Sequence, residues 1–366
     1  MELYILDRNL NLIGVIDNVI SLIWNRRYQL SGDFELHVSS TYENIALLKQ
    51  DNIIYKKGDV EAGYIQFRNL VLDDKGKETL KVTGSFLTNY ISKRIIWGTE
   101  NLNCTTELAM RILVDKNCIN PSDIKRKIPL LTLGELKNYT NNINFQNTGD
   151  NILERLTDIS RTSELGYRVK LDRSNKVLKF EVYKGVDRSV NQTAIAPTIF
   201  SRDFENVKSE EYTNDMSDFR NTCLIAGTGE GIARKKTTIG DANVGLDRYE
   251  IYVDARDITN TKTVNDTEIT IPDSEYIPML QQRGNEKLEE FKEIKTFESE
   301  VNTSGNNVYK VDYDLGDIVT YLDKKWGVQV STRITEIQEV YEGGKVSIIP
   351  TFGTNIPTIY EKLKRM

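Results

Sequence analysis

Short segments in which apolar and polar residues alternate recur from one end of the chain to the other. In the stretch 33–38, for example, Phe34, Leu36 and Val38 share one face of a period-two pattern, which is typical of a half-buried β-strand. Turn-forming residues such as Asp73-Asp74-Lys75-Gly76 separate these segments. The chain must therefore fold mainly as β-structure with short connections.

Strand patterns gather toward the two ends of the chain, and the middle is mixed. The predicted strands cover 3–5, 12–15, 21–28, 33–38, 51–55, 62–72 and 78–86, then 167–171, 177–183, 209–212, 221–226, 233–239, 248–253, 308–311, 318–322, 328–340 and 346–351. The first two segments, joined by Asp7-Arg8-Asn9, predict a hairpin.

Four segments carry apolar residues at helical spacing instead. They are 42–50, 105–118 with Thr105 as N-cap, 150–164 ended by Gly166, and 273–295. Strands therefore outnumber helices, and the segregated order of the two predicts an α+β fold.

Length sets the number of units. A chain of 366 residues, 39% hydrophobic, is long enough for two or more units with their own cores. We expect two similar β-barrel-like lobes at the chain ends and a mixed α/β insert between them. The predicted divisions are an N-terminal β lobe at 1–95, the insert at 96–205, a β segment with a long helix at 206–300, and a C-terminal β lobe at 301–366 that pairs with the preceding segment.

The two ends also echo each other. The stretches 65–84 and 334–353 have equal length, and each reads as strand, acidic-glycine turn, strand and glycine. Each follows a Gly-Asp-aliphatic step, at Gly58-Asp59-Val60 and at Gly316-Asp317-Ile318. Similar hairpins are common in β proteins, so from these residues alone a duplication and a coincidence both stay open.

The charge balance argues against a protein that wraps nucleic acid. The chain has 54 acidic and 48 basic residues, a net charge of −6, whereas proteins that bind duplex DNA present basic stripes. The basic clusters Lys125-Arg126-Lys127 and Arg234-Lys235-Lys236 are short, and we expect both on the solvated surface.

No catalytic or metal-binding pattern is visible, and we predict no enzyme, no cofactor and no catalytic or metal site. The chain has a single histidine, His37, which lies opposite the apolar face of its strand. Because there is only one histidine, we expect neither a His-Cys zinc cluster nor a Ser-His-Asp triad. Cys104, Cys118 and Cys223 lack metal-ligand spacing, and the first two flank a helix that should keep them apart. A glycosidase needs only two carboxyl groups, and the sequence offers no way to select a pair.

Two further segments resemble ligand loops only superficially. The glycines of 226–231 follow a strand, as in a phosphate-binding loop, but the next residues alternate like a strand and provide no helix N-terminus. This segment is therefore predicted to be a hairpin loop. Asp312-Tyr313-Asp314 lacks the ligand spacing of a calcium loop.

No targeting or membrane segment is visible. The N-terminus lacks a basic region followed by an apolar stretch, and no apolar run approaches the ~20 residues that span a bilayer. We expect synthesis in a cytoplasm and no stable membrane insertion.

Several segments, taken together and in order, resemble the tail-tip hub or tail-associated proteins of siphophages, which are baseplate hub-like. The matching segments are 3–9, 14–18, 22–28 and 32–36 at the start, 221–231 and 245–257 in the middle, and Leu315-Gly316-Asp317-Ile318-Val319 with Arg333-Ile334-Thr335-Glu336-Ile337 near the end. The resemblance thus covers the chain in patches.

This resemblance implies a virion structural protein of the tail tip that forms a homotrimeric ring. Two similar lobes in each of three subunits would present six lobes to the tail tube and three-fold symmetry to the tip. Implied partners are the distal tail or tail tube proteins, the tape-measure protein, and tip or receptor-binding proteins. DNA would pass only transiently, during genome ejection, through a channel whose mild acidity lets it slide.

Two other functions remain for comparison. Family members often carry a C-terminal extension with a peptidoglycan hydrolase or receptor-binding module, and since the sequence ends at Met366 we expect separate proteins to supply those roles. The alternative is a carbohydrate-binding adaptor of the tail tip, for which the 18 tyrosines offer aromatic side chains.

Overall fold

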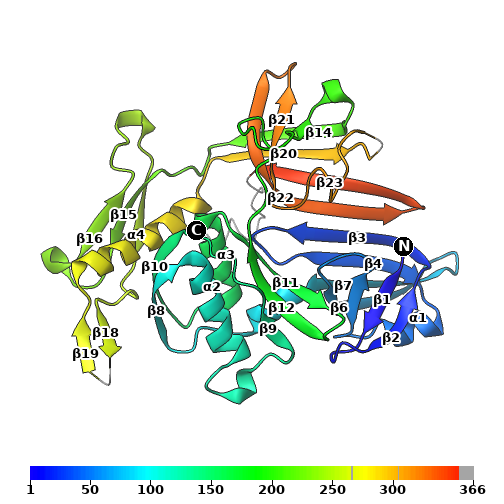
Figure 1. Cartoon of the computed structure of the whole chain (residues 1–366), viewed down its shortest axis with the longest axis horizontal. Coiled ribbons are helices and arrows are strands. Elements are labelled where there is room, and N and C mark those ends of the chain that lie inside the picture. Colours follow the sequence, from blue (N-terminus) through cyan, green and yellow to red (C-terminus); the bar gives the residue numbers. More distant parts are fainter. Residues whose placement is uncertain (265–266, 304, 354–366) are drawn as a thin grey trace.

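The computed structural model describes residues 1–264, 267–303 and 305–353 (Figure 1). It confirms a strand-dominated α+β fold. One 13-stranded sheet contains most of the strands. Its members are β1 (Leu3–Leu6), β2 (Leu12–Ile16), β3 (Val19–Arg27), β4 (Asp33–Ser39), β5 (Ile53–Lys56), β6 (Gly63–Leu72), β7 (Glu78–Phe86), β13 (Ile199–Phe200), β14 (Val207–Asp215), β20 (Ile294–Val301), β21 (Ile318–Asp323), β22 (Val328–Glu342) and β23 (Lys345–Gly353).

The smaller elements belong to the middle of the chain. The paired strands are β8 (Thr99–Thr105) with β10 (Asn142–Thr148), β9 (Leu131–Leu133) with β11 (Gly166–Asp172) and β12 (Val177–Tyr183), β15 (Thr222–Ala226) with β16 (Lys236–Ile239) and β17 (Glu250–Asp254), and β18 (Thr261–Val264) with β19 (Thr267–Thr270). The α-helices of the described residues are α1 (Tyr42–Leu47), α2 (Thr106–Val114), α3 (Ile152–Ser163) and α4 (Asp273–Glu290).

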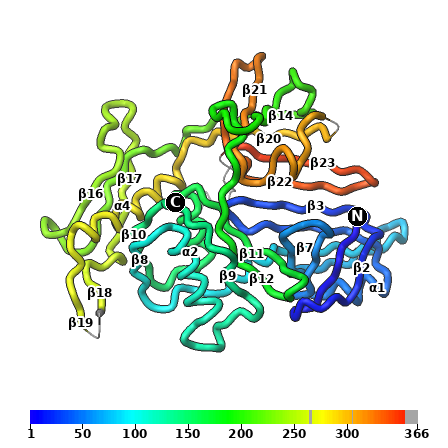
Figure 2. Tube along the Cα trace, in the orientation of Figure 1, coloured from blue at the N-terminus to red at the C-terminus, as the bar shows by residue number. Residues whose placement is uncertain are grey.

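Strands from the two ends of the chain form one continuous sheet. Its order is β14-β20-β23-β22-β3-β4-β7-β6-β5-β1-β2, and β22 pairs antiparallel with β3. Figure 2 shows β22, from the C-terminal end of the chain, lying beside β3. The expected barrel-like lobes are therefore not closed in the part of the chain that is described, because β3 and β22 satisfy each other's backbone edges.

Two hydrophobic cores lie on this sheet, one for each end of the chain. The first contains Trp24, Phe34 and Phe86, and the second contains Phe297, Tyr321 and Phe352. The alternation of β4 is the local cause of the first, since Phe34, Leu36 and Val38 are all buried.

The two halves of the sheet also have the same connectivity. The antiparallel pairs β3·β4, β4·β7, β7·β6 and β6·β5 have counterparts in β14·β20, β20·β23, β23·β22 and β22·β21. A register shift occurs in β3 between Val19 and Ser21, and in β14 between Val207 and Ser209. Another occurs in β6 between Ile65 and Phe67, and in β22 between Ile334 and Glu336.

Two details of the sequence echo do not align. Ile65 pairs with Gly84, whereas Ile334 pairs with Phe352, one residue before Gly353. The Gly-Asp steps also differ in place, since Gly58 follows β5 and Gly316 precedes β21. Both glycines have positive φ, which explains the shared residue type without a shared position.

The middle of the chain packs under the N-terminal part of the sheet. A third core joins α2 and α3 to residues of that sheet, among them Leu6, Ile53 and Tyr64. A fourth core holds α4 against β15 through Tyr276, Leu280 and Ile225, on the side of the molecule away from the N-terminus (Figure 1).

Most predicted elements are confirmed, with shifted ends. The helix predicted at 105–118 ends as an α-helix at Val114 and continues as a π-turn to Ile119. Gly166 does not end α3, because Glu164 adopts the left-handed conformation there and Gly166 begins β11. The last helix stops at Glu290, since β20 begins at Ile294.

One predicted strand is wrong. Residues 308–311 form a turn, in which the N–H groups of Val311 and Asp312 both donate to the carbonyl of Val308. The Asp312 carboxylate accepts from the Val308 N–H at 2.7 Å and reinforces the turn. Of the predicted C-terminal lobe at 301–366, residues 304 and 354–366 lie outside the described part of the chain.

Candidate functional site: a charged junction between the two ends of the chain

The pairing of β3 with β22 brings together charged side chains that are far apart in the sequence. In this register Arg27 lies opposite Glu336 and Trp24 lies opposite Glu339. We call the buried and half-buried polar side chains around this pairing the junction cluster. Its members are Arg26, Lys56, Asp59, Glu61, Tyr309, Lys310, Asp314, Glu339 and Tyr341.

Arg26 is the most buried cation of the junction cluster. Its alternation with Leu22 and Trp24 places it on the buried face of β3, where it is 1% exposed. Its guanidinium donates to the Tyr309 hydroxyl and to Asp314 Oδ1, each at 2.7 Å, and Nε lies 3.4 Å from Glu61 Oε2. Arg26 therefore links the N-terminal sheet to the 305–317 loop.

Lys56 makes the second link. Its ammonium lies 3.0 Å from Asp59 Oδ2, forms an ion pair with Glu339 and donates to the Tyr341 hydroxyl at 3.3 Å. Lys310 closes the group, with Nζ 3.5 Å from Asp59 and 3.7 Å from Glu339. Buried cations and carboxylates are thus paired, as low-polarity surroundings require.

The carboxyl groups of the junction cluster respond differently to burial. Burial acts to raise the pKa of Asp59, but the nearby charges of Lys56, Arg26 and Lys310 outweigh it and lower that pKa. Burial raises the pKa of Glu61 despite the opposing effect of Arg26. The charged form of Asp59 therefore depends on its cationic neighbours.

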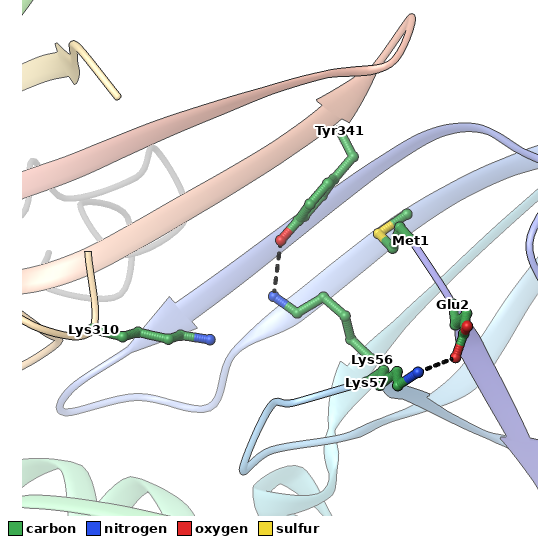
Figure 3. A pocket seen from close by; sticks show the side chains of 6 residues that line it. All are labelled: Met1, Glu2, Lys56, Lys57, Lys310 and Tyr341. Carbon is green, nitrogen blue, oxygen red and sulfur yellow. Dashed lines mark hydrogen bonds and ion pairs between the residues drawn. The ribbon is translucent and has the colours of Figure 1, made fainter. Parts of the chain in front are cut away.

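A pocket of about 370 Å³ opens above Lys56 (Figure 3). Met1, Glu2, Lys57, Lys310 and Tyr341 also line it. Figure 3 shows Lys56 reaching toward Tyr341 while Lys57 pairs with Glu2, at 2.7 Å. The cations on the wall all have anionic partners, and this arrangement fixes the two ends of the chain against each other.

No metal centre or membrane helix appears in residues 1–264, 267–303 and 305–353. No three His, Cys, Asp or Glu side chains there are grouped to hold a metal ion. No helix there is long and apolar enough to cross a membrane.

Segments that the sequence singled out lie where expected, with one exception. The glycine-rich segment connects the antiparallel strands β15 and β16, which confirms the hairpin. Cys104, Cys118 and Cys223 are free thiols, and His37 is half-buried beside Glu35 at 2.7 Å. Arg234 is the exception: it is not solvated, because its guanidinium donates to the carbonyls of Ala226 and Gly227.

Sequence reasoning missed the junction cluster. The available signal was the position of Arg26, which shares the face of Leu22 and Trp24 in an alternating strand. Its partners could not be read from the sequence, because Asp314 lies 288 positions away.

In the described part of the large sheet, unpaired edges occur at β2, at β14 and along part of β6. Beyond Gln66, β6 pairs only with β7 within the described part of the chain, and its exposed apolar residues there are Phe67, Leu70, Val71 and Leu72. β14 pairs only with β20 among the described strands. Free edges of this kind are ready to pair with another strand.

Comparison with protein-family models identifies one family. The model of the family of Siphovirus ReqiPepy6 Gp37-like proteins matches residues 2–354. Comparison with curated protein sequences gave no match.

Solved structures with a similar fold include three tail proteins. A tail protein from Neisseria meningitidis MC58 has 13% identity and a TM-score of 0.57, with 96% of each chain covered. A 43 kDa tail protein of prophage MuSo2 from Shewanella oneidensis has 14% identity and a TM-score of 0.56, with 96% of this chain and 98% of that chain covered. The prophage tail protein gp18 from Listeria monocytogenes EGD-e has 11% identity and a TM-score of 0.54, with 100% of this chain and 98% of that chain covered. Because the family model spans nearly the whole chain, this protein belongs to the siphovirus tail protein family of ReqiPepy6 Gp37-like proteins.

Proposed function

We propose that this tail protein is the hub subunit of the tail tip, and that three copies form a ring which joins the tail tube to the tip and surrounds the DNA exit channel. The observation that carries the proposal is the repeated connectivity of five strands, β3-β4-β7-β6-β5 and β14-β20-β23-β22-β21. With two such units per chain, a trimer presents six similar units, which suits a six-fold tube on one side.

The strand equivalence is supported residue by residue. Matching the register shifts aligns Val19 with Val207 and Trp24 with Tyr212. Trp24 packs on Phe34 with ring centroids 5.8 Å apart, and Tyr212 stacks on Phe297 at 4.4 Å. Two hairpins that resembled each other by chance would share neither the shifts nor this aromatic pair.

The junction cluster gives the two units a fixed relation within one subunit. A ring needs each subunit to present its units at a constant angle, and buried ion pairs across β3 and β22 restrict that angle. The four divisions at 1–95, 96–205, 206–300 and 301–366 belong to the proposal as the two units and the segments inserted between them.

The proposed setting follows from the family. The protein is made in the host cytoplasm and assembles into the virion at the tail tip, beside tube, tape-measure and tip or receptor-binding proteins. We expect no catalytic activity. DNA contacts the channel only during ejection, past a wall that is not basic. A channel lined mainly by Lys and Arg would contradict this last point.

The test is the mass of the purified full-length chain in solution, measured by light scattering over a range of concentrations. We expect a trimer, or a mass that climbs toward three subunits as concentration rises. A stable assembly that is not a multiple of three would overturn the ring.

A monomer at every concentration would favour the alternative, a carbohydrate-binding adaptor. Binding to an array of bacterial surface glycans would then be measured with the same preparation. Specific glycan binding by the monomer would replace the hub proposal.

A further inference from the structure

The contact between the two units of one chain gives a template for the contact between chains. Inside the subunit, the second half of β22 pairs antiparallel with β3. The register shifts make β6 the counterpart of β22 and β14 the counterpart of β3. We propose that β6 of one copy pairs antiparallel with β14 of the next copy, so that one sheet runs around the ring. This inference rests on the proposed trimer and names its interface.

The edge of β6 is open where the template requires it. β5 and the two residues before it cover β6 as far as Ile65, just as β21 and the two residues before it cover β22 as far as Ile334. From Glu336 onward β22 is covered by β3, whereas the matching part of β6, from Phe67 onward, has no such neighbour among residues 1–264, 267–303 and 305–353.

The exposed side chains of β6 suit burial against a second strand. Leu70 is 55% exposed and Leu72 is 66% exposed. The residue of β22 that corresponds to Leu70 is Glu339. It is only 1% exposed, because β3 pairs with β22 there. Together with Phe67 and Val71, the two leucines form a run of exposed apolar residues on one strand, and such a group, unlike a single exposed residue, is typical of a surface that binds a partner.

The edge of β14 is open in the matching way. It has the same nine-residue length as β3 and pairs with β20 on one side only. The template places Asn69 of β6 opposite Thr213 of β14, as Gln338 lies opposite Asn25. It also places Leu70 opposite Tyr212, whose ring is half-buried on Phe297.

Charge favours two different edges over two like edges. β14 carries three carboxylates, Glu210, Glu211 and Asp215, and one cation, Lys208, whereas Arg68 is the charged residue of β6. Pairing β14 with another β14 would bring together two strands of net negative charge, whereas β6 has a net positive charge. A contact between two different edges is heterologous, and such a contact produces a ring when the rotation closes.

The test is a disulfide across the predicted register in the full-length chain. Directly opposed residues in antiparallel strands have Cα atoms ~4.5–5.5 Å apart, within disulfide reach. The double variant Asn69→Cys/Thr213→Cys is oxidised with oxidised glutathione and separated by non-reducing electrophoresis. The matched control, Asn69→Cys/Lys208→Cys, moves the second thiol five residues along β14, which is ~17 Å.

We expect the first variant to give a covalent dimer and then a covalent trimer as its largest species, and the control to remain monomeric. Circular dichroism of both reduced variants must match the unaltered chain. Ladders that continue beyond three subunits, or equal cross-linking in the control, overturn the interface.

The outcome separates the interface from the ring. If light scattering shows a trimer but the first variant gives no cross-link, the proposed function stands and the β6–β14 interface fails. If the unaltered chain does not form a trimer and the first variant gives no covalent trimer, both fail.

Discussion

Arg26 shows how much a single position contributes to this fold. It stands in phase with the apolar face of β3, so the strand that builds the N-terminal core also buries a guanidinium. Its partners come from Glu61 and from the distant Asp314. Burying a charge this deeply is stable only while its partners are present.

Replacing Arg26 by methionine should destabilise the protein strongly. The change leaves Asp59, Glu61 and Asp314 without their shared cation in a buried site, and removing one partner of such a group costs ~3–5 kcal/mol. Urea unfolding measures the change in the free energy of unfolding. Lys57→Ala is the control, because Lys57 pairs with Glu2 on the exposed rim of the same pocket, and we expect no measurable loss. Equal losses for the two variants would contradict the role of Arg26.

Asp59 should make the stability depend on acid pH. Its pKa is lower in the folded protein than in the unfolded chain, so the carboxylate contributes stability at pH values above its unfolded pKa of ~3.9. This contribution is lost as the pH falls below that value toward the folded pKa. The Asp59→Asn variant should therefore be less stable than the unaltered chain at pH 7, and the difference should shrink below pH ~4. Thermal unfolding over a pH series checks this, and a difference that stays constant would contradict it.

At the scale of the element, register shifts interrupt the regular pairing of β6 with β7 and of β22 with β23. Gly84 lies opposite the shift in β6, where a Cβ atom would stand 1.9 Å from the Tyr64 carbonyl oxygen. Only glycine fits that approach between two strands.

The Gly84→Ala variant should be destabilised by ~2–3 kcal/mol, because the strand must move to relieve the overlap. The neighbouring Ser85→Ala is the control. Ser85 is half-buried, and its hydroxyl donates a hydrogen bond to the exposed side chain of Gln66 in β6. Chemical denaturation of the two variants measures the difference. A Gly84→Ala variant as stable as the control would show that the strands adjust freely.

The free edge of β6 should affect assembly and not folding. Val71 is 43% exposed on β6, and Val15 is 47% exposed on the edge strand β2. A lysine at either position should change the free energy of unfolding by no more than ~0.5 kcal/mol. Only Val71→Lys should weaken the trimer, because β2 is not part of the proposed interface, and sedimentation velocity compares the two. Loss of the trimer in Val15→Lys alone would move the interface to β2.

For the whole molecule, the β3–β22 pairing joins residues from the two ends of the chain into one sheet. Gln338 lies opposite Asn25, and their side chains share a hydrogen bond of 3.0 Å. The two units are thereby held in one arrangement before any partner binds.

A disulfide from Asn25→Cys/Gln338→Cys should form and should leave assembly unchanged, because the halves already have the required arrangement. Closing so long a loop should stabilise the chain by ~2–4 kcal/mol. Thermal unfolding with and without reductant measures the gain, and light scattering measures the assembly. If the oxidised variant is stable but does not assemble, the two units must move relative to each other during assembly.

The amino-acid sequence by itself determined many of the local elements, although the strands β8, β10, β18, β19 and β20 were not predicted from it. Alternation in Asp33–Ser39 and helical spacing in Ile152–Ser163 are properties of neighbouring residues, so they were predictable within a few positions. The same is true of the glycine-rich hairpin, whose flanking strands carry their own pattern. The turn at 308–311 was missed because a hydrogen bond from Val308 to the Asp312 side chain overrode an apolar pattern.

Only the tertiary structure decided which strands became neighbours. Pairing β3 with β22 requires contacts between residues about 300 positions apart, and nothing in either strand alone selects that partner. The burial of Arg26 among Tyr309 and Asp314, the open edges of β6 and β14, and the shared register shifts all follow from that choice. Long-range pairing depends on the fit of whole faces, and a linear pattern does not contain that information.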